Sequence, residues 1–209
     1  MKKIKALVIS GLIFFSGTFL TNAQDAISIS GTLASARIVA PLGFTLTGTL
    51  KFGSVAKPAA AAGTVVLNPE TESRVLTGVT NVGATGSNDD FGLPTYTVTG
   101  EVGLQFTLTL PNGPVTINLS VQGASTDGGT TPGAWTTVTE TDNADSMDIT
   151  NFTSYTAADS APVESTSRSG LVIGTTTAND YVVGATLTVA SDQKTGYYRG
   201  TYTVTAQYD

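Results

Sequence analysis

The chain has 209 residues, contains neither cysteine nor histidine, and carries more acidic than basic residues. These absences exclude disulfides, nucleophile systems that depend on His or Cys, and zinc or haem sites with nitrogen or sulfur ligands. Three of the ten basic residues lie in the first five positions, so the rest of the chain has seven basic against sixteen acidic residues, a net charge of −9. Because such a surface repels phosphate groups, we expect no nucleic-acid partner.

The N-terminus has the pattern of a secretory signal peptide. Met1–Lys5 is basic, Ala6–Leu20 is an apolar run, and Thr21–Ala23 supplies small residues for cleavage. The pattern predicts a signal peptide over residues 1–23, with an uncleaved anchor as the alternative, and one mature domain over residues 24–209. The apolar run is shorter than the about 20 residues of a membrane helix, and no second run follows. We therefore expect an exported protein without a membrane span after cleavage, located in the periplasm, on the cell surface or outside the cell.

Alternation of apolar and polar residues predicts β-strands along the mature chain, separated by turns rich in Gly, Pro and Asn. The clearest runs are Leu104–Leu110, Val115–Val121 and Val183–Val189. Between the first two runs, Pro111–Pro114 predicts a hairpin turn, and Leu108 and Leu119 are expected to point into the core. Each run has one apolar face that needs an opposing sheet. The sequence therefore predicts an all-β fold, a single antiparallel immunoglobulin-like β-sandwich.

Two short patterns are weak indications of a chemical site. Ser191–Lys194 matches the S-x-x-K pattern of penicillin-recognising enzymes, but it falls in a predicted turn and its companion motifs are absent. A cluster of acidic residues does not have EF-hand spacing, and a solvated loop is favoured there over a looser calcium site. The cluster consists of Glu140, Asp142, Asp145 and Asp148. We expect no enzyme activity, and accordingly no catalytic residue, cofactor or metal.

Trp135 is the only tryptophan and follows the predicted loop Gly123–Gly133. An exposed indole ring can stack on a sugar or a partner protein, whereas a buried one would anchor the loop. Both interpretations stay open, and Trp135 is therefore a candidate ligand-stacking residue.

The two ends of the mature chain carry the most informative patterns. Near its start, Ile27, Ile29, Gly31 and Leu33 alternate with polar residues. At its end, residues 196–209 predict one long alternating strand. The residues of interest in that strand are Gly196, Tyr198, Tyr202, Val204, Ala206 and Tyr208. Because chain ends tend to fray, a terminal strand with a large aromatic side chain requires something that pairs with it or covers it.

Several segments resemble, in order, the exported bacterial proteins of the domain-of-unknown-function 4402 family. They are Ala36–Leu42, Leu50–Gly53, Gly63–Leu67, Tyr96–Gly100, Leu108–Pro111, Gly184–Leu187 and Gly196–Tyr208. The chain is more distantly similar to spore coat U and chaperone–usher pilin subunits. Their last strand has a penultimate aromatic residue and a glycine near its start, the places of Tyr208 and Gly196 here. The cysteine pair that those pilins usually carry is absent from this chain.

The resemblance to pilins implies a pilin-like sandwich and a function in assembly or adhesion. We expect a cell-surface or fimbrial structural subunit in which residues 24–33 of one copy add a strand to another copy or a related subunit, with a periplasmic chaperone as a further candidate partner. The alternative is a self-contained secreted module in which residues 27–33 form the first strand. Such a module would bind a carbohydrate or a surface protein through loops such as Gly123–Trp135.

Overall fold

The computed structural model describes residues 35–82, 91–123, 133–138, 143–164, 166–174 and 179–209. Residues 39–209 form one compact unit. The predicted signal peptide and the predicted donor residues Ile27, Ile29, Gly31 and Leu33 lie outside the described residues.

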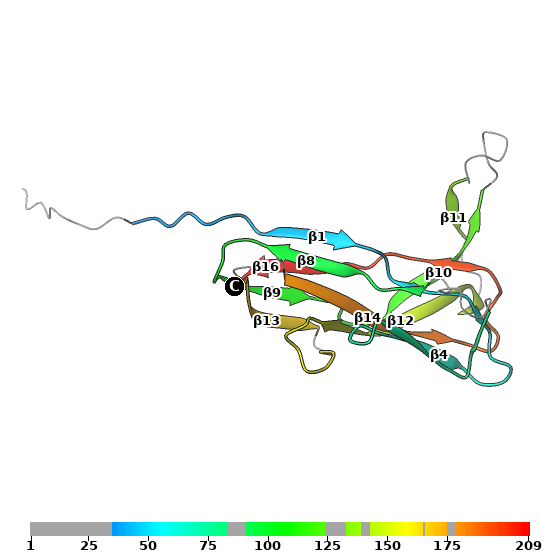
Figure 1. The fold of residues 1–209 in the computed structure, drawn as a ribbon. Coiled ribbons are helices and arrows are strands. Elements are labelled where there is room, and N and C mark those ends of the chain that lie inside the picture. The colour runs from blue at the N-terminus through cyan, green and yellow to red at the C-terminus, as the bar shows by residue number, and fades with distance from the viewer. Residues whose placement is uncertain (1–34, 83–90, 124–132, 139–142, 165, 175–178) are drawn as a thin grey trace, which may run out of the picture. The chain divides into compact units, whose positions relative to one another are not determined.

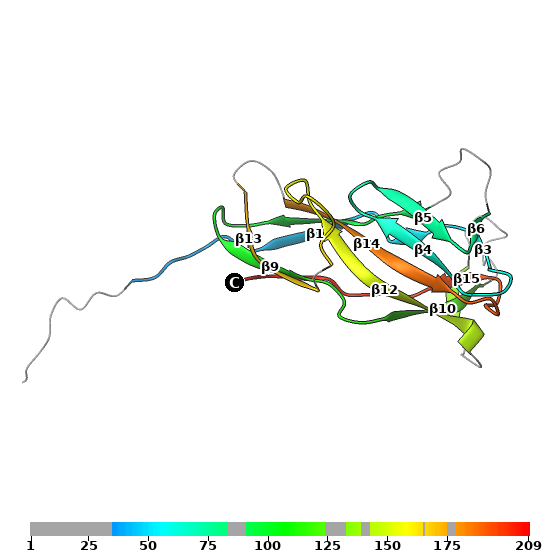
Figure 2. The same ribbon diagram turned by 90° about the horizontal axis from the view of Figure 1, so that it is seen from below.

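Within the described residues, the regular structure is antiparallel β-strand apart from one short 3-10 helix, η1 (Asn143–Asp145) (Figures 1 and 2). The larger sheet contains β1 (Gly43–Thr47), β4 (Gly63–Asn68), β5 (Ser73–Thr77), β8 (Thr95–Thr99), β10 (Val115–Gln122), β11 (Trp135–Thr137), β12 (Ser146–Tyr155), β14 (Asn179–Val189) and β15 (Tyr197–Arg199). The smaller sheet contains β9 (Gln105–Thr109), β13 (Ser167–Val172) and β16 (Thr205–Tyr208). Two short ribbons pair β2 (Lys51–Phe52) with β7 (Phe91–Gly92), and β3 (Val55–Ala56) with β6 (Thr80–Asn81). In this part of the chain no helix is long and apolar enough to cross a membrane.

The two sheets face each other across one apolar core. The smaller sheet contributes Phe106 and Leu108, and the larger sheet contributes Val183, all with no exposed surface. The rings of Phe106 and Tyr181 meet edge to face across the interface, with centroids 6.0 Å apart. Full burial of such a side chain stabilises the fold by about 1.5–3 kcal/mol. The predicted all-β sandwich and the inward faces of residues 104–110 and 183–189 are confirmed.

The longest strand, β14, organises the larger sheet. One side of β14 pairs with β12, while its other side pairs first with β8 and then with β4. Gly184 lies between the last residue paired with β8 and the first paired with β4. A Cβ atom at this position would collide with the carbonyl oxygen of Leu67 in β4. Glycine is therefore needed at the point where two strands share one edge of β14.

The Pro111–Pro114 connection is not a hairpin turn, and this prediction is wrong. β9, before the connection, pairs with β13 and β16 in the smaller sheet, whereas β10, after it, pairs with β11, β12 and β15 in the larger sheet. Proline cannot donate to a ladder, so the two prolines interrupt pairing where the chain changes sheet.

The C-terminal segment changes sheet at the same level, so the prediction of one continuous strand over residues 196–209 is also wrong. β15 pairs with β10 in the larger sheet and β16 with β9 in the smaller sheet, and residues 200–204 between them contain no strand. β9 and β10, on either side of the prolines, thus pair with β16 and β15 to form one antiparallel ribbon, which is interrupted between the two pairs. Figure 1 shows β9 and β16 side by side at one end of it.

The alternating pattern of β10 also misled the core prediction. Leu108 is fully buried as expected, but Leu119 is only half-buried and does not belong to the core cluster. Ser120, expected on the outer face, is only 4% exposed because Thr137 of β11 and Tyr197 of β15 flank it on both sides.

Candidate functional site

β16 forms one edge of the smaller sheet. β9 pairs with one side of it, from Thr205 opposite Thr109 to Tyr208 opposite Phe106. No strand among the described residues pairs with its other side. Along residues 202–208, half-buried apolar side chains alternate with exposed polar ones. The half-buried side chains are Tyr202, Val204, Ala206 and Tyr208. In contrast to the buried apolar face of β9, the apolar face of the last strand is left partly open.

β1 forms an edge of the larger sheet and adjoins the edge formed by β16. Among the described strands it pairs only with β8, and Leu46 on it is 55% exposed. The Tyr208 hydroxyl contacts Ala40 just before β1, while the Tyr202 hydroxyl contacts Tyr96 of β8, which pairs with Leu46. The C-terminal segment therefore runs antiparallel to β1, with Tyr208 near the start of β1 and Tyr202 near its end. We call these two adjoining strands, β1 and β16, the open edges.

Tyr208 holds the C-terminal end in place. Its hydroxyl accepts a hydrogen bond of 2.8 Å from the backbone N–H of Glu101 and donates one of 2.9 Å to the carbonyl oxygen of Ala40. The Ala40 N–H donates to the Glu101 carboxylate at 3.3 Å. A Cβ atom at Gly100 would collide with the Tyr208 hydroxyl. The penultimate aromatic residue thus joins three segments, and Gly100 leaves room for its hydroxyl.

Asp209 fixes the end of the chain across the smaller sheet. Its backbone N–H donates to the carbonyl oxygen of Gln105 at 3.1 Å. Its carboxylate accepts hydrogen bonds from the Thr107 hydroxyl of β9 and, at 2.9 Å, from the Gly170 N–H of β13. The side chain of the last residue therefore bonds to both other strands of the sheet, which opposes fraying of the terminus.

A group of aromatic side chains lies between the open edges. The rings of Phe44 and Tyr96 stack with centroids 5.4 Å apart, and the rings of Phe152 and Tyr202 lie 5.3 Å apart. The hydroxyls of Tyr96 and Tyr202 share a hydrogen bond of 3.1 Å. Burial raises the pKa of the Tyr202 hydroxyl far above its usual value, and the pKa of Tyr96 is raised by burial as well. Both phenols are therefore neutral at ordinary pH, as the apolar surroundings require.

The structure separates the predicted C-terminal site residues into two groups. The first group lies at the C-terminal end: Ala206 and Tyr208 are on the open edge of β16, and Tyr202 and Val204 are in the segment just before it. Gly196 and Tyr198 lie instead beside β10 in the larger sheet. The Tyr198 hydroxyl lies 2.8 Å from the Ala144 carbonyl oxygen and accepts a hydrogen bond of 2.9 Å from Gln193.

Gly196 has a local structural role. Its φ of 153° favours glycine, and a Cβ atom there would collide with the Leu119 side chain. Gly196 and Tyr198 therefore belong to the start of β15 in the larger sheet and not to the open edge of β16.

Trp135 lies on β11 and is half-buried. Its ring meets that of Tyr197 at a centroid distance of 5.0 Å and an interplanar angle of 66°. The Arg199 guanidinium lies over the Trp135 ring at 4.7 Å from its centroid. We did not predict Tyr197 or Arg199 from the sequence, although both alternate with Tyr198 and so belong to the opposite face of that strand.

The acidic cluster does not come together as a site in the described residues. Asp145 is 1% exposed and forms an ion pair of 2.7 Å with Lys194, the lysine of the S-x-x-K pattern. Asp148 accepts a hydrogen bond of 2.8 Å from Thr116. Glu140 and Asp142 lie outside the described residues. Within the described ranges no group of three or more acidic side chains is arranged to hold a metal ion.

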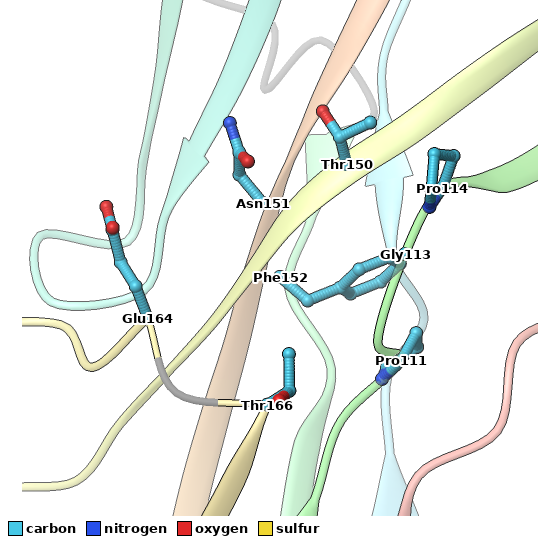
Figure 3. Close-up of a pocket in the computed structure, with 8 residues that line it drawn as sticks. All are labelled: Pro111, Gly113, Pro114, Thr150, Asn151, Phe152, Glu164 and Thr166. Atoms are coloured by element: carbon cyan, nitrogen blue, oxygen red, sulfur yellow. The ribbon is translucent and has the colours of Figure 1, made fainter.

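A shallow cavity of about 360 Å³ lies between the proline-flanked connection, β12 and the chain before β13 (Figure 3). The lining residues are Pro111, Gly113, Pro114, Thr150, Asn151, Phe152, Glu164 and Thr166. Asn151 has a φ of 49° where the pairing register of β12 shifts between Thr150 and Thr153, and Figure 3 shows the Phe152 ring turned toward Gly113. Glu164 is the one carboxylate of the lining, whereas glycoside hydrolysis uses a pair, so the cavity does not favour that chemistry.

The described residues thus define an antiparallel β-sandwich with adjoining open edges in its two sheets. Residues 117–208 match the model of a protein family described as Domain of unknown function (DUF4402). This segment belongs to that family, as the sequence resemblance predicted. The match includes the C-terminal open edge and Trp135, but the resembling segments before residue 117 lie outside it. No curated protein and no solved structure gives a significant match. The similarity to spore coat U and pilin subunits stays a prediction.

Proposed function

We propose that the protein is an exported structural subunit of a cell-surface or fimbrial assembly, joined to other copies or related subunits by β-strand complementation. The observation that carries this proposal is the pair of open edges. The two edge strands belong to facing sheets, adjoin each other, and have apolar side chains that are only partly buried.

An unpaired strand edge provides backbone hydrogen-bonding groups and side-chain pockets for an incoming strand. In β16 the half-buried side chains recur at every second residue, and the apolar residues of 27–33 recur with the same period. The occupant that we propose is therefore this segment of a second subunit. Three of its side chains, those of Ile27, Ile29 and Leu33, would lie against the apolar faces, and Gly31 would lie where the edge is most shallow.

The free energies of side-chain burial and backbone hydrogen bonding are large enough to allow such an assembly. Burial of an Ile or Leu side chain contributes about 1.5–3 kcal/mol, and each added backbone hydrogen bond contributes about 0.5–1.5 kcal/mol net. Association costs about 4–15 kcal/mol. Three apolar side chains alone therefore offset only the lower part of that cost, so stable assembly requires the backbone hydrogen bonds along β16 as well.

The experiment compares purified protein of residues 24–209 with a variant that lacks residues 24–33. Sedimentation should show concentration-dependent polymers for the first and monomers for the second. A synthetic peptide of residues 24–33 should bind the shortened variant and protect the amides of residues 205–208 from hydrogen exchange. The matched control is the same peptide with Gly31→Leu, which should bind at least tenfold more weakly. A full-length protein that stays monomeric at all concentrations would contradict the proposal and favour the self-contained module.

A further inference from the structure

One face of the larger sheet combines two aromatic rings with polar side chains, of which Ser120 is buried. Strand register places Ser120 opposite both Thr137 and Tyr197, so these three residues share one face. The opposite face includes Tyr198, which packs against the core, and Val121, which is 55% exposed. We call the first of these faces the aromatic patch. It consists of Asn118, Ser120, Gln122, Trp135, Thr137, Tyr197 and Arg199.

Tyr197 contributes the more exposed of the two rings in the aromatic patch. It is 70% exposed, while Trp135 is half-buried and has the Arg199 guanidinium over its ring. Trp135 also meets Tyr197 edge to face. The indole therefore supports the tyrosine ring from the side and holds the guanidinium beside it, so the patch is organised before a ligand arrives. The candidate for ligand stacking thus moves from Trp135 itself to the neighbouring tyrosine.

We propose that the aromatic patch binds a neutral saccharide chain, with one pyranose ring lying on the exposed face of Tyr197. A pyranose has an apolar face of C–H groups and a rim of hydroxyls, and it needs an aromatic surface surrounded by donors and acceptors. Arg199 and Gln122 flank the two rings with guanidinium and amide groups, and Thr137 adds a hydroxyl.

The composition of the patch favours a saccharide over a protein partner. The buried centre of a protein interface is enriched in apolar side chains, but none of the seven described residues that make up the patch is aliphatic. It favours a neutral ligand over a charged one because its one cationic group already lies over the Trp135 ring, and Asp148, which strand register places on the same face, accepts a hydrogen bond from Thr116. No residue of the patch belongs to the open edges, so the proposed binding site and the proposed assembly can be tested independently of each other.

The single tryptophan makes the test specific, since emission excited selectively from tryptophan comes from one indole inside the patch. Purified protein of residues 24–209 would be titrated with neutral hexasaccharides of glucose, mannose and N-acetylglucosamine. We expect a saturable change in Trp135 emission with at least one of them. Tyr197→Ala should weaken binding at least tenfold, and Tyr197→Phe should stay within about threefold of the parent because it keeps the ring face. Val75→Ala, at a position 52% exposed on β5, is the matched control and should leave binding unchanged.

Four results would overturn the proposal. The first is the absence of a saturable change with all three hexasaccharides, checked by calorimetry. The second is unchanged binding by Tyr197→Ala. The third is binding only of a uronic-acid hexasaccharide, which would identify a charged ligand. The fourth is loss of self-association, rather than of sugar binding, on Tyr197→Ala, which would identify a protein contact. Thermal unfolding of each variant shows that it is folded, which is expected because the tyrosine is exposed.

Discussion

Replacement of Tyr208 by phenylalanine removes one hydroxyl group and keeps the ring. That hydroxyl accepts from the Glu101 N–H at 2.8 Å and donates to the Ala40 carbonyl at 2.9 Å. Each hydrogen bond contributes about 0.5–1.5 kcal/mol net, so Tyr208→Phe should lower the free energy of unfolding by about 1–3 kcal/mol. Urea unfolding of residues 24–209 measures this as a lower midpoint at constant slope. Tyr197→Phe, which removes a hydroxyl from an exposed ring, is the control and should cost less than about 0.5 kcal/mol.

A double-mutant cycle that combines Gly100→Ala with Tyr208→Phe tests the contact between Gly100 and the Tyr208 hydroxyl. A Cβ atom at Gly100 would collide with the Tyr208 hydroxyl and would approach the Ile173 side chain to 2.8 Å. Gly100→Ala alone should therefore cost about 1–3 kcal/mol through overpacking. In the double variant the phenylalanine ring leaves room for the methyl group, so the combined cost should fall short of the sum by at least about 0.5 kcal/mol. Additive costs would refute the placement of the tyrosine hydroxyl against Gly100.

Three further predictions concern the core, alkaline stability and export. Leu108→Ala should cost about 2–5 kcal/mol in urea unfolding, because Leu108 is fully buried, whereas Val172→Ala, at a 50% exposed position, should cost well under half of that. Because burial raises the pKa of Tyr202 above the unfolded value of about 10, the contribution of Tyr202 to stability should be constant below about pH 10 and fall above it by up to about 1.4 kcal/mol per pH unit. Tyr202→Phe should reduce that slope, and an unchanged slope would contradict the assignment. Mass spectrometry of the exported protein should find an N-terminus at Gln24 or within a few residues, and a chain that retains the first residue would contradict cleavage.

Local alternation predicted which side chains enter the core because the two faces of a strand depend only on its own residues. Phe106 and Leu108 on β9, and Val183 on β14, lie inside as expected. The same rule failed at Leu119 because β10 extends beyond the part of the sheet that the core covers, and apolar residues there have less to pack against. Periodicity identifies a face, but it does not say how far the opposing sheet reaches.

The sequence pattern of a strand could not predict which other strands pair with it. A Pro–Asn–Gly–Pro sequence is compatible with a tight turn and with a break in a ladder, and the choice depends on strands far away in the chain. Here β13 and β16 pair with β9, and β12 and β15 pair with β10, so the two runs on either side of the prolines belong to different sheets. The aromatic patch was missed for a related reason. Trp135 and Tyr197 are brought together only because their strands, β11 and β15, both pair with β10.

The change of sheet in the C-terminal segment connects the fold to the proposed assembly. If residues 200–208 had continued along β10, they would have lengthened the larger sheet and left β9, with its buried Phe106 and Leu108, as the open edge. Instead the C-terminal segment breaks opposite Pro111–Pro114 and its last strand pairs with β9. Ala206 and Tyr208 then lie beside Leu108 and Phe106, and the Tyr208 hydroxyl reaches Ala40 just before β1. The hydrogen bonds of Tyr208 and Asp209 then fix this arrangement. The unpaired edge is thus formed by a strand anchored at its end, as a site that must accept a strand from another subunit without unfolding requires.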